Sequence, residues 1–176
     1  MASDHVQDLI TTLQQTGARQ LNDRVCAIIS AAFIEGCLGD LIVTKMPSLN
    51  GELRKKMFEG TGALSTAAAR MDVAFALGII EKSWYNDLIQ IARIRNRFAH
   101  NVRITSFEDG DIPEIIGKMR YRLGDGQDYG DQDAQARAYL REDWDKSGNR
   151  EKFNSTASYL IITLSNLVCA AERTGA

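Results

Sequence analysis

The side chains best suited to chemistry gather in one short segment, Ile91 to Asn101, which reads I-A-R-I-R-N-R-F-A-H-N. It holds three arginines, two asparagines and one of the two histidines of the chain. A guanidinium group can offset the negative charge of a phosphate, and an imidazole can transfer a proton near neutral pH. Polar groups are costly at the end of a buried helix unless they have partners. This segment is therefore the first candidate for a site.

The spacing of apolar residues predicts the helix that positions these side chains. Apolar residues recur every three or four positions from Trp84 onward, which is the periodicity of one helical face. Ser83 can cap the start of the helix, and Asn101 suits a left-handed residue at its end. The predicted helix covers about residues 83–101.

The direction of each polar side chain follows from about 100° of rotation per residue. Arg95 falls near the centre of the apolar arc, whereas Asn96 and His100 share a polar face with Arg93 and Arg97. Arg95 and His100 are about 140° apart around the axis. They can act on one atom only if the last turn opens or a second copy of the helix faces the first. A homodimer would supply that second copy.

Length and composition describe an ordinary globular chain. The 176 residues suffice for one domain, with 44% hydrophobic and 25% charged residues, a net charge of −2 and a pI near 5.7. Dedicated nucleic-acid binders are usually basic, so contact with RNA or DNA would rely on local charge.

The three cysteines lack CxxC spacing, and the start lacks a targeting pattern. We expect reduced thiols, a cytoplasmic location and no membrane span, and the apolar run Val25 to Val43 is expected to be a core helix.

The rest of the chain also predicts helices. No segment alternates with a period of two, no repeat is visible and no linker separates two parts. We expect an all-α, single-domain bundle over residues 1–176, with about five to seven helices and a polar loop at 124–133. The predicted helices cover about residues 4–16, 22–45, 64–77, 83–101, 115–123, 134–146 and 151–172, and residues 50–56 are expected to form a further helical turn or two.

Two glycine-containing runs could suggest ligand loops. Gly60 and Gly62 do not belong to a GxxxxGK[ST] motif and follow no strand, so they are expected to turn the chain into the next helix. The run from Asp125 alternates aspartate and glycine, but Ala136 stands where a calcium loop has its final glutamate. The two histidines, His5 and His100, have no metal-ligand spacing. We expect neither a metal nor a cofactor.

Two family resemblances involve this segment. Arg95, Asn96 and His100 resemble the signature of the HEPN superfamily, which is an arginine, a polar residue, three further residues and a histidine. The members of that superfamily are helical bundles. Separately, the order of elements from Phe33 to His100 resembles the mannitol operon repressor family, which itself looks HEPN-like. This second match covers roughly two fifths of the chain. Its three runs are A-A-F-I-E-G-C-L, L-S-T-A-A-A-R-M-D-V-A-F-A-L-G-I-I and I-R-N-R-F-A-H.

The HEPN resemblance implies a metal-independent endoribonuclease or an RNA-binding protein, in a toxin, defence or stress-response role. His100 would be the general acid or base, Arg95 the phosphate clamp and Asn96 a positioning donor. Arg93 and Arg97 would bind the RNA backbone. The superfamily's dimers imply that two copies of the motif helix face each other across one cleft.

Two other interpretations stay open at this stage. Arg95 could pair with Glu35 or with Asp72 and lock three helices together, without any catalysis. The mannitol repressor resemblance instead implies a non-catalytic transcriptional regulator or adaptor that acts through protein–protein contacts. The candidate protein partner is an antitoxin or a regulator. No basic recognition helix of a helix-turn-helix is evident, so direct DNA binding would be unexplained.

Overall fold

The computed structural model describes residues 22–119 and 144–174, and no residue in these two ranges lies in a strand. This confirms the all-α bundle. The predicted helix at 4–16, the polar loop at 124–133 and most of the predicted helix at 134–146 lie outside the described residues. The helices are α2 (Asp23–Thr44), α3 (Gly51–Phe58), α4 (Ala67–Ala76), α5 (Lys82–His100), α6 (Ile112–Gly117) and α8 (Asn149–Thr174).

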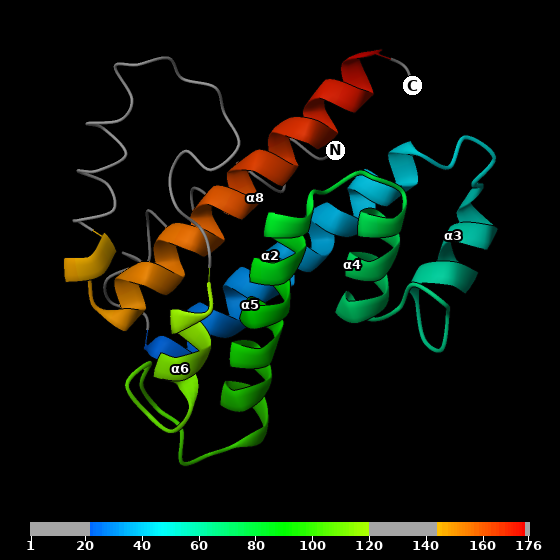
Figure 1. The fold of residues 1–176 in the computed structure, drawn as a ribbon. Coiled ribbons are helices and arrows are strands. Elements are labelled where there is room, and N and C mark those ends of the chain that lie inside the picture. The colour runs from blue at the N-terminus through cyan, green and yellow to red at the C-terminus, as the bar shows by residue number, and fades with distance from the viewer. Residues whose placement is uncertain (1–21, 120–143, 175–176) are drawn as a thin grey trace, which may run out of the picture.

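Helix α2 is central in the bundle. It packs along α8 on one side and against α4 and α5 on the other (Figure 1). Its apolar side chains and those of the neighbouring helices form one buried cluster. By length and composition alone α2 could cross a membrane, with a mean hydropathy of 1.9 over its most apolar stretch. Its contacts with three other helices account for this composition, because a central helix buries apolar residues on most of its faces.

Side-chain caps begin three of the helices. Asn22, Asn50 and Thr66 each accept a hydrogen bond from the backbone N–H three residues further on, at 2.9, 2.8 and 3.2 Å. The predicted start of α2 is thereby confirmed. The predicted Ser83 cap of α5 is wrong, because α5 begins after Glu81 and the Ser83 hydroxyl donates to the Glu81 carboxylate instead.

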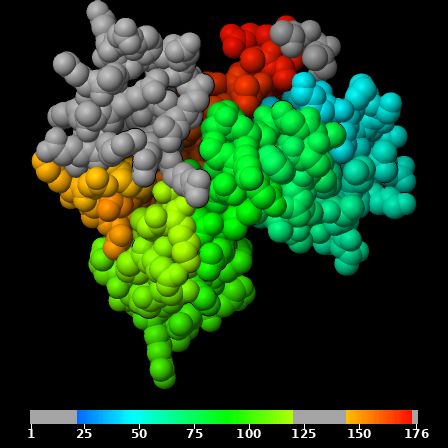
Figure 2. All heavy atoms as spheres, viewed as in Figure 1, coloured from blue at the N-terminus to red at the C-terminus, as the bar shows by residue number. Residues whose placement is uncertain are grey.

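Helix α3 stands at the edge of the molecule, where Figures 1 and 2 show it beyond α4. None of its residues is buried. Arg54 ties it to Asp40 of α2 through an ion pair of 3.0 Å, and the Phe58 ring lies under the Arg70 guanidinium, 5.4 Å from its centre. The helix is therefore held by Arg54 in its middle and by Phe58 at its end, and none of its residues is fully buried.

The glycines after α3 make the turn into α4, as the sequence predicts. Gly60 has a φ of +59°, a conformation that side chains with a Cβ rarely adopt. Gly62 lies against the end of α3, and a Cβ added there would lie 2.3 Å from the carbonyl oxygen of Met57 and 2.4 Å from that of Lys56. Both contacts are with backbone, which cannot move without disturbing the helix.

We expect Gly62→Ala to lower the free energy of unfolding by about 1–3 kcal/mol, the usual effect of overpacking. Urea unfolding followed by circular dichroism measures it. The matched control is Gly36→Ala in the middle of α2, where a Cβ meets nothing within 4 Å. That change should stabilise the helix by about 0.5–1 kcal/mol. Equal effects of the two substitutions would contradict the packing argument.

Candidate functional site

The segment that carries the polar cluster forms the second half of α5, but its orientation differs from the prediction. The buried residues there are Ile91, Ile94 and Phe98, and Arg95 is exposed. The apolar arc is therefore centred on Ile91 and Phe98, and Arg95 lies at its edge. The prediction that Arg95 occupies the centre is wrong, because Asp87 and Ile94 both face inward and shift the buried face away from it.

Arg95 does not form the predicted lock. Its Nη1 donates to the side-chain oxygen of neighbouring Asn96 at 3.0 Å, and no carboxylate of the described residues pairs with it. The Glu35 carboxylate is 3.6 Å from the Arg70 guanidinium, and Asp72 accepts a hydrogen bond of 2.7 Å from the Tyr85 hydroxyl. Glu35 and Asp72 thus bond to other partners, and pairing of either with Arg95 is wrong.

His100 and the two other arginines lie apart from this pair. His100 is exposed at the last residue of α5, and within the described part of the chain its side chain has no hydrogen bond or ion pair. Arg93 donates to Gln90 at 3.1 Å, and Arg97 makes two hydrogen bonds to one oxygen of Asp111, at 3.0 and 2.7 Å. The unbroken helix therefore does not bring Arg95 and His100 together within one chain.

The end of α5 is held by Arg24, at the start of α2. Its Nη1 donates to the carbonyl of Phe98, and its Nη2 donates to those of Asn101, Val102 and Ile104, at 3.1, 3.2 and 2.6 Å. Phe98 lies in the last turn of α5, where carbonyls lack helical partners, and the other three acceptors belong to the cap and the turn that follows, so the guanidinium joins the end of α5 to this turn. Asn101 is extended rather than left-handed, with φ −125° and ψ 105°. Sequence reasoning missed this contact, because Arg24 is 74 or more residues away from its acceptors.

The turn after α5 is fastened at two further points. Asp23 accepts a hydrogen bond from the backbone N–H of Phe107 at 2.8 Å and pairs with Arg150 of α8 at 2.7 Å. Asp109 accepts hydrogen bonds from the backbone N–H groups of Thr105 and Ser106 at 2.8 and 2.9 Å. The turn that follows the polar segment of α5 is therefore held to α2, and through Asp23 to α8, as well as by its own hydrogen bonds.

Hydrogen bonds from the Thr105 and Ser106 backbone lower the pKa of the Asp109 carboxyl below its ordinary value. A depressed pKa in the folded state means that the carboxylate contributes stability above its unfolded-state pKa of about 3.9, and that this contribution is lost as the pH falls through the folded value. We expect ¹³C NMR titration to find a lower pKa for Asp109 than for an aspartate in an unfolded peptide. A pKa at or above the peptide value would contradict these bonds.

A first groove lies where α2, α4 and α5 meet, and we call it the Arg95 groove. Its volume is about 360 Å³. Apolar side chains form its floor, and Arg95 and Asn96 lie on its α5 side, with Glu35 on its α2 side. The lining residues are Ala31, Ile34, Glu35, Leu38, Ser65, Thr66, Ala67, Ala68, Met71, Leu88, Ile91, Ala92, Arg95 and Asn96. The structure thereby brings together three predicted site residues, Arg95, Asn96 and Glu35, whereas His100 and Asp72 are not among the lining residues.

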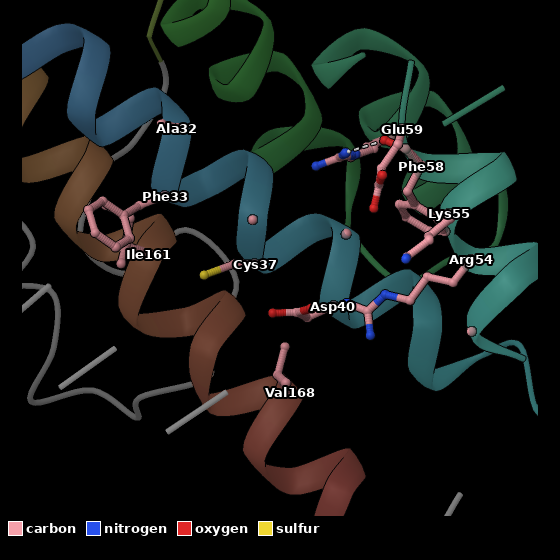
Figure 3. A pocket seen from close by; sticks show the side chains of 14 residues that line it. Ala32, Phe33, Cys37, Asp40, Arg54, Lys55, Phe58, Glu59, Ile161 and Val168 are labelled. Carbon is pink, nitrogen blue, oxygen red and sulfur yellow. Dashed lines mark hydrogen bonds and ion pairs between the residues drawn. The ribbon is translucent and has the colours of Figure 1, made fainter. Parts of the chain in front are cut away.

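A second groove, of about 710 Å³, lies between α2, α3 and α8, and we call it the α3 groove (Figure 3). Phe33 and Ile161 line one end, Cys37 the middle, and Lys55 and Phe58 of α3 the other end. Sequence reasoning did not predict this groove, since Ile161 and Val168 of α8 are more than 100 residues away from the lining residues of α2 and α3.

The cysteines are free thiols, as predicted. Burial raises the pKa of the Cys26 and Cys37 thiols, and Cys37 also lies 3.4 Å from the Ser165 hydroxyl. Both thiols are therefore weak nucleophiles at neutral pH. Among the described residues, no group of three or more histidines, cysteines and carboxylates could hold a metal ion.

Known proteins resemble this chain in sequence and in fold. The model of the mannitol repressor family matches residues 54–127, which include the segment with Arg95. The chain is similar to mannitol repressors. A solved structure described as the MtlR–HPr complex from Escherichia coli has the same fold, with a TM-score of 0.55 and 14% sequence identity over 92% of this chain and 96% of that chain. No curated protein matches the chain.

These two similarities overturn the predicted ribonuclease. The family model describes mannitol repressors, and the solved structure is described as a complex of MtlR with another protein, HPr. The alternative of a mannitol repressor-like regulator or adaptor that acts through protein contacts fits better, and the main prediction of an RNA-cleaving or RNA-binding protein is wrong. The resemblance to the HEPN superfamily stays a prediction, since neither comparison bears on it.

Proposed function

We propose that this chain is a non-catalytic regulator of the mannitol repressor type, which acts by binding a partner protein. The observation that carries the proposal is the shared fold over 92% of the chain with a protein whose structure is described as the MtlR–HPr complex. The match of the mannitol repressor family model to residues 54–127 supports it. HPr is accordingly the first candidate for the partner.

The surface of the molecule suits contacts with a protein. Two grooves open between helices, and arginines are exposed along the second half of α5. Arginine is enriched at the centres of protein interfaces, because its planar group binds carboxylates with two hydrogen bonds and also packs on apolar surface. The grooves and the arginines belong to elements that are packed or tied to the core, so a partner would meet a preformed surface.

Isothermal titration of the full chain with Escherichia coli HPr tests the proposal directly. We expect saturable binding with a Kd of roughly micromolar order, as is common for regulatory contacts of modest size. An unrelated acidic protein of similar size serves as the control and should give no heat of binding. A flat titration with HPr at concentrations of about 100 times that Kd contradicts the assignment of HPr as the partner.

A homodimer is the second assembly that we propose, as the sequence predicts. Size-exclusion chromatography with light scattering should give a mass near twice the 19.5 kDa of one chain. Dilution over a hundred-fold range separates a stable dimer from a weak one, because only the weak dimer dissociates by mass action. A mass of one chain at all concentrations would contradict the homodimer and leave the regulator proposal intact.

A further inference from the structure

We propose that the Arg95 groove receives an acidic segment of the partner protein, with an apolar side chain in the groove and a neighbouring carboxylate on the Arg95 guanidinium. This inference rests on the proposed function, because it assigns a surface and a chemistry to the partner of a regulator. It differs from the predicted lock, in which Arg95 would be neutralised within its own chain.

Small residues make the space for an apolar side chain. Ala31 of α2, Ala67 and Ala68 of α4, and Ala92 of α5 line the groove, where longer side chains would fill it. The floor below them is apolar, consisting of Ile34, Leu38, Met71, Leu88 and Ile91. The volume of about 360 Å³ is near the low end of ligand-binding cavities, which fits side chains of a docked segment.

Arg95 provides the positive charge that selects an acidic residue in the partner, next to the apolar side chain that enters the groove. Its guanidinium is exposed, and its one hydrogen bond in the described structure goes to the neutral amide of Asn96. A guanidinium has five N–H donors in a planar arrangement that matches a carboxylate, so most of its donors are open. The bond to Asn96 holds the group beside the groove.

Two other polar groups of the groove, Glu35 and Thr66, already have partners. The Glu35 carboxylate faces the Arg70 guanidinium at 3.6 Å, and the Thr66 hydroxyl accepts the N–H of Ala69 at 3.2 Å. Arg70 offsets the repulsion that Glu35 would exert on an incoming carboxylate. Arg95 is therefore the charged group of this groove that no acid compensates within the described residues.

The surroundings of Arg95 also favour an acidic partner. No aspartate or glutamate occurs between residues 88 and 107, whereas this stretch contains Arg93, Arg95, Arg97 and Arg103. Only Arg97 pairs with an acid in the described structure, Asp111. A local excess of positive charge attracts an acidic surface and speeds its association. Because the chain as a whole carries a net charge of −2, this positive charge is a local feature of α5 and of the turn that follows it.

The test uses two capped tetrapeptides with the sequences Ala-Leu-Glu-Ala and Ala-Leu-Gln-Ala, titrated to millimolar concentration into the full chain. NMR follows the methyl groups of Ile34, Met71 and Ile91 and the Nε–H of Arg95. We expect the glutamate peptide to shift both sets of signals, and the glutamine peptide to bind roughly ten-fold more weakly because it lacks one charge-assisted contact. The preference should decrease as salt is added.

Matched variants assign the effect to the groove. Arg95→Gln should remove the preference for glutamate, whereas Arg93→Gln, which removes the same charge from an exposed position outside the groove, should retain it. Ala68→Leu fills the groove from its exposed side and should reduce binding of both peptides. Unchanged circular dichroism confirms that each variant is folded, and Arg95→Lys distinguishes charge alone from the planar group.

Several outcomes overturn the inference. They are equal binding of the two peptides, the absence of any shift, shifts confined to the α3 groove, and an unchanged preference in Arg95→Gln. The proposed function fails separately, in the titration with HPr. If HPr binds the wild type and Arg95→Gln equally, the regulator proposal stands and the Arg95 groove is not the contact. If the glutamate peptide binds but HPr does not, the groove stands and another acidic partner replaces HPr.

Discussion

Arg24→Met should lower the free energy of unfolding by about 2–4 kcal/mol, because it removes a charged donor shared by four carbonyls. Methionine keeps most of the aliphatic stem, so the loss reports on the hydrogen bonds rather than on packing. The carbonyls of Phe98 and Ile104 are part-buried with their donor, and water can replace the guanidinium there only in part. Chemical unfolding measures the change in stability.

The same substitution should loosen the segment that it holds. We expect amide hydrogen exchange to accelerate from Phe98 to Phe107 while the protection of α8 decreases less. The matched control is Arg103→Met, an exposed arginine of the same turn whose side chain has no bond in the described structure. It should change the stability by less than about 0.5 kcal/mol. Similar losses for both variants would show that Arg24 has no special part in holding α5.

Arg70→Met is the second substitution with a large expected effect, also about 2–4 kcal/mol. The guanidinium donates to the carbonyls of Leu64, Glu35 and Phe58, at 2.8, 3.1 and 3.3 Å, and faces the Glu35 carboxylate. Its side chain is only 14% exposed. Removal therefore leaves part-buried carbonyls without a donor and Glu35 without its cation, and α4 loses its main polar tie to α2 and to the end of α3.

Arg54→Met provides the comparison for this prediction. Arg54 pairs with Asp40 at 3.0 Å, but its side chain is 53% exposed, and exposed ion pairs contribute about 0–1 kcal/mol. Thermal unfolding of the two variants should therefore differ clearly. Arg70→Lys should recover only part of the stability, since an ammonium cannot reach three carbonyls in different directions as the planar group does. Full recovery by lysine would contradict the geometric argument.

The second half of α5 shows what the spacing of residues can predict and what it cannot. Periodicity correctly predicted a helix that ends near His100, because one face of α5 is apolar at three- and four-residue intervals. It did not predict that Arg95 is exposed. A rotation of the buried arc by about 50°, half the angle between successive residues, is enough to move a side chain from the centre of the arc to its edge. That rotation depends on how α2 and α8 pack against α5.

The sequence by itself determined the elements, since apolar periodicity, cap residues such as Asn22 and the glycines after α3 act through neighbours a few residues away. Only the tertiary structure decided the partners. Arg24 meets the end of α5 across 74 or more residues, and Arg70 rather than Arg95 faces Glu35. The Arg95 groove likewise exists because alanines of three separate helices meet. Such contacts depend on which helix faces pack together, and local spacing carries no information about that choice.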